Sequence, residues 1–196
     1  MFEVRIHGRG GQGVVTTAEL LSVAAFSDGR QAQAFPTFGS ERTGAPVVGF
    51  CRIDDRPIRT HEPIAAPDAV VIQDATLLHQ VDVFDGLDTD GYLLVNTSRS
   101  LAELGLETYV RRFRPDRVLT VPATEQALAH LGRPLPGAAL LGAFAALTGQ
   151  VRLESVTSAV EDRFAGAIAV GNVAAVHAAY DLVRRQLEEA SRVHTD

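Results

Sequence analysis

The sequence has little cysteine and no recognisable metal motif. Cys51 is the single cysteine among 196 residues, so the chain cannot form an internal disulfide framework. It also cannot hold an iron–sulfur cluster by itself, because a cluster needs several thiolates. The six histidines, including His7, His61 and His79, show no metal-ligand spacing. We therefore expect no metal ion on this chain, and Cys51, in mid-strand, is predicted to be a small buried residue.

Long apolar segments are also scarce, and acidic residues outnumber basic ones. The net charge is −6, which makes nucleic acid and anionic membranes poor candidate partners. Met1 leads directly into a predicted strand without a signal peptide, and we expect no apolar run of membrane-span length. These features predict a cytoplasmic protein without membrane insertion.

The composition is that of a globular chain, with 46% hydrophobic and 21% charged residues. Its length fits one ordinary domain, and no internal repeat or interdomain linker is visible. We expect a single domain over residues 1–190 and a frayed tail over 191–196.

The N-terminal stretch predicts a strand, a glycine turn and a helix. Phe2, Val4 and Ile6 alternate with polar residues, as in a strand with one apolar face. Four glycines follow over residues 8–13, and helical periodicity continues from there to Asp28. Such a turn allows close backbone approach, and the helix N-terminus offers free N–H groups to an anion.

The turn does not complete a dinucleotide-binding motif. Gly8, Gly10 and Gly13 satisfy G-x-G-x-x-G, but the predicted second strand, 30–36, carries no acidic residue to hold a ribose. The lysine of a P-loop is missing as well. Two interpretations stay open: an anion site, or a tight turn whose glycines only let the helix pack closely on the sheet.

A shaped loop follows over residues 35–46, rich in proline, glycine and phenylalanine. It contains Glu41 and Arg42. These two residues form either a solvated ion pair or a site in which Arg42 meets an anionic ligand near the glycine turn, since a guanidinium suits a phosphate.

Residues 47–53 are predicted to form a strand. Short apolar runs predict three further strands over 69–73, 91–95 and 117–121, of the kind covered on both faces of a parallel sheet. Helical periodicity fills the last third of the chain. The predicted fold is α/β, with a Rossmann-like, mostly parallel sheet, helices on both faces and a helical C-terminal third. Asp74, Asn96 and Thr124 follow strands and could line a ligand site, although helix N-capping is the favoured role of Asp74 and Thr124.

Several sequence blocks, in one order, cover nearly the whole chain. They are His7–Gly13, Ala34–Pro46, Arg52–Ile58, Pro67–Leu78, Leu141–Gly149 and Gly171–Ala175. Together they resemble the γ subunit of the pyruvate:ferredoxin oxidoreductase family, the thiamine-dependent 2-oxoacid oxidoreductases.

The resemblance implies an oxidative decarboxylation in which a 2-oxoacid and coenzyme A give an acyl-CoA, carbon dioxide and two electrons. It places thiamine diphosphate, Mg²⁺ and [4Fe-4S] clusters on partner α, β and ferredoxin-like subunits, and part of the coenzyme A site on this chain. We assign that contact to Gly10, Gly11, Gln12 and Gly13, with Thr16 and Arg42 as further candidates, and assign no catalytic residue.

Two loops depart from the family pattern, at Pro136–Gly137 and at Val121–Pro122. Residues 40–46 look closest to the pyruvate-type branch, and relatives acting on branched or aromatic 2-oxoacids such as phenylglyoxylate also fit. The rival hypotheses are a stand-alone NAD-dependent oxidoreductase and a purely structural assembly subunit.

Overall fold

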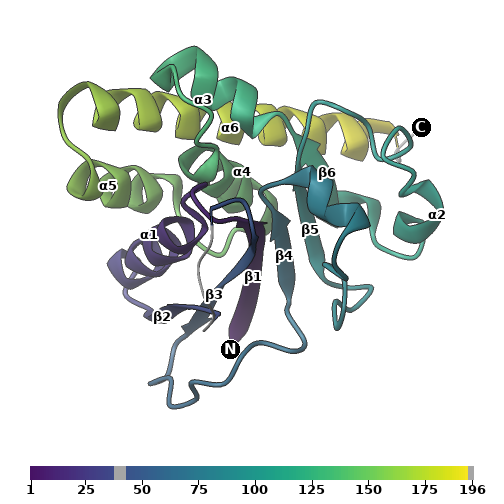
Figure 1. Cartoon of the computed structure of the whole chain (residues 1–196), viewed down its shortest axis with the longest axis horizontal. Coiled ribbons are helices and arrows are strands. Elements are labelled where there is room, and N and C mark those ends of the chain that lie inside the picture. The colour runs from purple at the N-terminus through teal and green to yellow at the C-terminus, as the bar shows by residue number, and fades with distance from the viewer. Residues whose placement is uncertain (38–42, 194–196) are drawn as a thin grey trace.

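The computed structural model describes residues 1–37 and 43–193, and a six-stranded sheet lies at its centre (Figure 1). The strand order is β2-β3-β1-β4-β5-β6. β1, β4, β5 and β6 pair in parallel, while β3 runs antiparallel to both β1 and β2. The strands are β1 (Phe2–Arg9), β2 (Gln31–Pro36), β3 (Pro46–Asp54), β4 (Ala69–Ile72), β5 (Tyr92–Asn96) and β6 (Val118–Val121).

The long helices predicted from periodicity are all present. Among the short elements, the favoured capping role of Asp74 implied a helix start at η1, whereas α2 and η2 were not predicted, because segments of three or four residues are too short to show a period. The helical elements are α1 (Val14–Ser27), η1 (Ala75–His79), α2 (Glu107–Val110), η2 (Pro115–Arg117), α3 (Ala123–Leu131), α4 (Gly137–Thr148), α5 (Leu153–Arg163) and α6 (Gly166–Val193).

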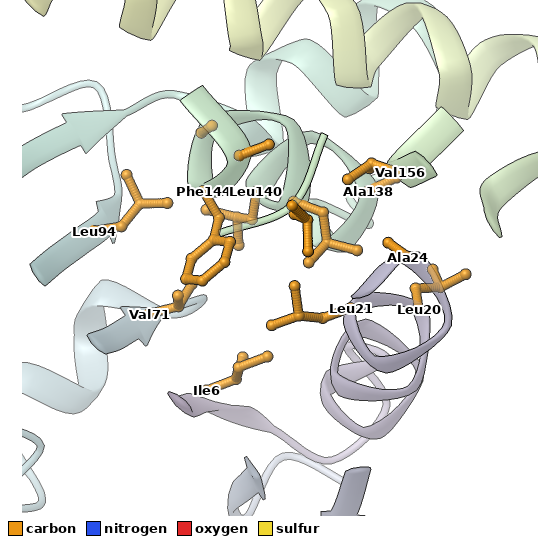
Figure 2. Close-up of a cluster of buried hydrophobic side chains, with 14 of the residues drawn as sticks. Ile6, Leu20, Leu21, Ala24, Val71, Leu94, Ala138, Leu140, Phe144 and Val156 are labelled. Carbon is orange, nitrogen blue, oxygen red and sulfur yellow. The ribbon is translucent and has the colours of Figure 1, made fainter. Parts of the chain in front are cut away.

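Apolar side chains cover both faces of the sheet. On one face, Ile6, Val71 and Leu94 pack with Leu21 of α1 and Phe144 of α4 (Figure 2). The other face packs beneath η1, α2 and their connecting loops, and its cluster comprises Val70, Ile72, Leu77, Val83, Leu87, Leu93, Val95, Leu104, Leu106, Phe113 and Val118. Burial on both faces explains the continuous apolar runs of the parallel strands, so the predicted α/β fold is confirmed.

The sheet order creates a topological switch point between β1 and β4. From β1 the chain passes through α1 to β2 and β3 on one side of the sheet, and it later returns to β4 on the other side. Ligands in open α/β sheets bind beyond the carboxyl ends of the strands at such a point. The glycine turn directly follows β1 and therefore lies there.

Helix α6 contradicts the expectation that no apolar run approaches the length of a membrane span. Over Gly166–Arg192 it is long and apolar enough by length and composition, and 33% of its apolar window is buried. It packs against α3, α4 and α5, and Val176, Ala179 and Val183 enter the core. A core helix of a globular domain passes the same test, so this is weak evidence for a membrane span.

Candidate functional site

The glycine turn presents unpartnered backbone N–H groups at the start of α1. Gly11 and Gly13 have φ values of 91° and 74°, in the left-handed region that favours glycine. Gly13 is the N-cap of α1, no side chain caps this helix, and its first turn carries no acidic residue. The N–H groups of Gly11, Gly13 and residues 14–16 donate no hydrogen bond to any described residue. These donors and the positive end of the helix dipole suit an anion.

Gly10 and Gln12 use their backbone N–H groups in hydrogen bonds that stabilise the turn. The N–H of Gly10 donates to the carbonyl of Ala45 at 2.9 Å, and the carbonyl of Gly10 accepts from the N–H of Gly44 at 3.0 Å. The N–H of Gln12 donates to the carbonyl of Arg9 at 3.0 Å. The backbone of Gly10 therefore fixes the segment that precedes β3, and its amide is occupied.

The side chain of Gln12 fastens the turn to the end of β4. Its Oε1 accepts from the N–H of Arg9 at 2.8 Å, and its Nε2 donates to Oδ2 of Asp74 at 2.7 Å. The backbone carbonyl of Gln12 accepts a third bond, from Nε2 of the buried Gln73. We name Arg9, Gln12, Gln73 and Asp74 the turn clamp.

Asp74 and Arg9 neutralise each other within the turn clamp. Arg9 Nε lies 3.2 Å from Asp74 Oδ2, and its guanidinium also donates to Thr76 Oγ1 and to Gln80. Burial acts to raise the pKa of Asp74, but hydrogen bonds from Thr76 and Gln12 together with the charge of Arg9 lower it overall. Asp74 also accepts from the N–H of Thr76 as the N-cap of η1, so its predicted capping role is confirmed.

Gly8 fits the interpretation of the glycine turn as a packing device, whereas Gly11 and Gly13 fit its interpretation as an anion site. A Cβ at Gly8 would lie 2.4 Å from Cγ2 of Val14, so Gly8 permits α1 to pack on β1. A Cβ at Gly13 would meet no atom within 4 Å, and one at Gly11 would meet only Thr43 at 3.9 Å. Gly11 and Gly13 therefore serve the conformation of the turn and leave open space in front of it.

The ends of the strands form a polar crevice beside the turn. It has a volume of about 540 Å³ and contains the predicted tip residues Asp74, Asn96 and Thr124. Thr124 is not the N-cap of α3, which is Pro122; instead, the N–H of Thr124 donates to Oδ1 of Asn96 at 3.1 Å. The N-cap prediction for Thr124 was wrong because a residue of the neighbouring strand supplies the acceptor.

Two smaller hollows flank the turn. One, of about 330 Å³, lies between the turn and residues 43–47 and includes Thr16. The other, of about 230 Å³, has mostly apolar walls and extends between α1, α4 and α6. Among the predicted site residues, Gly10, Gly11, Gln12, Gly13 and Thr16 thus gather around three adjoining hollows.

Not every predicted residue can be placed, and some contributors were not foreseen. Arg42 and Glu41 lie outside the described residues. Two members of the turn clamp, Arg9 and Gln73, were not predicted. The available signals were an arginine inside the glycine run and a glutamine just before Asp74.

The buried ionisable groups Cys51 and His7 line none of the three hollows. Cys51 is 0% exposed, as predicted for a small core residue, and burial raises its thiol pKa to about 12. Burial, aided by the charge of Arg5, lowers the pKa of His7 to about 4. At neutral pH both side chains are uncharged.

Removing the carboxylate of the turn clamp should loosen the glycine turn. In Asp74→Ala, Gln12 Nε2 and Arg9 lose their charged acceptor, which costs about 1.5 kcal/mol of local stability. Amide hydrogen exchange at Arg9, Gly10 and Gln12, whose N–H groups donate hydrogen bonds in the turn, is therefore expected to accelerate roughly tenfold. Asp88→Ala is the matched control, because Asp88 accepts a similar turn hydrogen bond from the N–H of Asp90. Unchanged exchange at these three amides would contradict the role of the clamp.

The structure defines a Rossmann-like α/β protein with an open glycine turn at the sheet switch point. Known proteins with similar sequences and folds identify its family. The family model for pyruvate ferredoxin/flavodoxin oxidoreductase matches residues 3–182. The chain is 51% identical over 160 residues to pyruvate synthase subunit PorC of Methanosarcina barkeri, covering 82% of this chain and 85% of the relative. It is 48% identical over 181 residues to the pyruvate/ketoisovalerate oxidoreductases common subunit gamma of Pyrococcus abyssi, covering 92% and 96%.

A solved structure has the same fold. The crystal structure of pyruvate oxidoreductase subunit PORC from Thermotoga maritima superposes with a TM-score of 0.80 at 36% identity, covering 92% of this chain and 95% of that one. The chain belongs to the pyruvate ferredoxin/flavodoxin oxidoreductase family. It is a γ-type subunit of a 2-oxoacid:ferredoxin oxidoreductase complex, so the predicted family is confirmed.

Proposed function

We propose that this subunit supplies part of the coenzyme A site in a CoA-acylating 2-oxoacid:ferredoxin oxidoreductase. The complex would convert a 2-oxoacid and coenzyme A into an acyl-CoA, carbon dioxide, a proton and two electrons. The role of this chain is to bind and orient coenzyme A; the oxidative chemistry takes place on other subunits.

The unpartnered N–H groups of Gly11, Gly13 and residues 14–16 carry this proposal. They lie at the positive end of α1 and line the hollow of about 330 Å³, which adjoins the crevice beyond the strands through Gly10 and Gly11. A pyrophosphate supplies the negative charge and the acceptor oxygens that such donors need. Thr16, half-buried beside the turn, can add a hydroxyl donor.

The remaining cofactors are assigned to partner subunits. Thiamine diphosphate, Mg²⁺ and [4Fe-4S] clusters would lie on the α, β and ferredoxin-like subunits, which pass the electrons on. The single, fully buried cysteine of this chain supports that division, because a cluster needs several accessible thiolates. We propose the cytoplasm as the location, where 2-oxoacids and coenzyme A are available.

The 2-oxoacid is proposed to be pyruvate or a branched or aromatic relative, selected by other subunits. The matching Pyrococcus abyssi protein is described as a subunit common to pyruvate and ketoisovalerate oxidoreductases. A subunit shared between two substrates supports substrate selection elsewhere in the complex.

A stand-alone NAD-dependent enzyme is disfavoured by the sheet. In a dinucleotide fold, a parallel strand next to β1 ends in the acidic residue that holds the ribose. Here antiparallel β3 pairs with β1 on that side, and Pro46 lies opposite Arg9 beside the turn. The site thus lacks the strand end that would carry the acid.

Calorimetric titration distinguishes coenzyme A binding from the two rivals. The assembled complex should bind coenzyme A and not NAD⁺, and the partner subunits without this chain should bind coenzyme A much more weakly. Equal coenzyme A affinity with and without this chain would leave it a purely structural subunit.

A further inference from the structure

The apolar hollow beside the glycine turn has not been given a role. It has a volume of about 230 Å³ and is bounded by α1, the loop between α3 and α4, and the start of α6. It adjoins the turn directly, because Gln12, Gly13 and Thr16 also line it. Its apolar walls are Leu20, Leu131, Leu135, Ala138, Phe164 and Ile168, of which Leu20 and Ala138 are labelled in Figure 2.

An arginine without a partner lies at this hollow. Arg133, on the loop between α3 and α4, is exposed, and its side chain makes no hydrogen bond or ion pair with any described residue. The other arginine that lines the three hollows, Arg9, is paired with Asp74. Within residues 1–37 and 43–193, Arg133 is therefore the cation at the site that is available to an anionic ligand.

We propose that this hollow is the subsite for the adenosine end of coenzyme A, with Arg133 binding the 3′-phosphate. This inference rests on the proposed function, because the pyrophosphate at the glycine turn connects the two parts of the ligand. The adenine faces pack against leucine, isoleucine and phenylalanine side chains, and the 3′-phosphate accepts hydrogen bonds from a planar guanidinium.

The chemistry of the two ends of coenzyme A determines the orientation. The thiol must reach thiamine on another subunit, so the pantetheine arm has to leave this chain. Its amides and hydroxyl need polar partners, which the crevice supplies through Gln73, Asp74 and Asn96. The adenosine end has no such constraint and suits the hollow that three elements of this chain enclose.

Arg133→Gln tests the 3′-phosphate contact in the assembled complex. The dissociation constant for coenzyme A should rise roughly tenfold, the effect of losing a charge-assisted hydrogen bond, and that for dephospho-coenzyme A should not change. Arg133→Lys should retain part of the preference for the 3′-phosphate. Arg56→Gln is the matched control, since Arg56 is exposed and its side chain has no described partner. It follows β3 beside the start of β1, at the end of these strands opposite the glycine turn.

Ile168→Trp tests the apolar wall. Ile168 is 42% exposed, so a larger side chain can be accommodated while it narrows the hollow. Binding of coenzyme A and dephospho-coenzyme A should weaken alike, whereas 4′-phosphopantetheine, which has no adenosine, should bind as before. Val170→Trp is the control, because Val170 lies on the same helix, is 71% exposed and does not line the hollow.

Failure of this subsite can be told apart from failure of the proposed function. If Gly11→Ala weakens coenzyme A binding but Arg133→Gln and Ile168→Trp do not, the hollow is not the adenosine subsite. The coenzyme A site at the glycine turn is then still supported. An equal loss for coenzyme A and dephospho-coenzyme A in Arg133→Gln would overturn the 3′-phosphate assignment. If Gly11→Ala itself does not change coenzyme A binding, both the coenzyme A site at the turn and the adenosine subsite are contradicted.

Discussion

Replacing Gly11 with alanine is expected to raise the Michaelis constant for coenzyme A by roughly ten- to a hundredfold in the assembled complex. At the φ of 91° found at Gly11, an alanine is strained by about 1–3 kcal/mol. The new methyl group would meet only Thr43 at 3.9 Å, so the protein itself has room for it. The loss therefore comes from a turn that relaxes away from its phosphate-binding geometry and from a methyl group in the ligand's space.

In Gly11→Ala, the Michaelis constant for the 2-oxoacid should stay at its wild-type value, because that substrate reacts at thiamine on other subunits. Gly29→Ala is the matched control. Its φ of 81° imposes similar strain, and its Cβ would meet nothing within 4 Å, but it lies at the far end of α1. A rise for the 2-oxoacid alone, or no change in either constant, would show that the turn does not bind coenzyme A.

The sequence predicted the framework of the fold because its signals are local. Alternation over residues 2–6, the glycine run and helical periodicity place β1, the turn and α1 correctly. Continuous apolar runs predicted strands with two covered faces. The antiparallel insertion of β3 between β1 and β2 was not predictable in this way, because β1 pairs with residues that lie 37 to 51 positions further along the chain.

The candidate site was predictable in place but not in detail. Four glycines in six residues identify the turn, yet they do not show which amide groups are free. The N–H of Gly10 donates to the carbonyl of Ala45, and the side-chain amide of Gln12 donates to Asp74, which is 62 residues away. No local sequence pattern identifies Arg133 as a site residue, because its role depends on how α3, α4 and α6 assemble around a hollow.

A contact between distant segments also predicts that substitution of Asp28, at the C-terminal end of α1, strongly lowers the free energy of unfolding. Its side chain is 8% exposed and supports the start of α5, whose N-cap, Arg152, makes no capping hydrogen bond of its own. Oδ2 of Asp28 accepts from the N–H of Arg152 at 2.8 Å, and Oδ1 accepts from the hydroxyl of the buried Ser155. One carboxylate thus joins α1 to α5 and satisfies donors at the helix end.

Asp28→Ala should lower the free energy of unfolding by about 2–4 kcal/mol, because it leaves these donors unsatisfied. The guanidinium of Arg152 is 68% exposed and adds little to this loss. Urea unfolding of the chain at pH 7 measures the effect. Asp55→Ala is the control, because Asp55 pairs with Arg30 while 85% exposed, and its loss should cost about 1 kcal/mol or less. Equal destabilisation by the two substitutions would contradict the proposed link.

The contribution of Asp28 should also depend on pH in a defined direction. Burial acts to raise its pKa, but hydrogen bonds from Ser155 and Arg152 and the charge of Arg152 outweigh burial and lower the pKa overall. A carboxylate whose pKa is lower in the folded state binds protons first in the unfolded state. Its stabilisation is therefore fully present above the unfolded-state pKa of about 3.9 and is lost as the pH falls through the lower folded-state value. The difference in unfolding free energy between the wild type and Asp28→Asn should accordingly shrink from pH 7 to pH values of about 3, and a difference that grew on acidification would contradict this assignment.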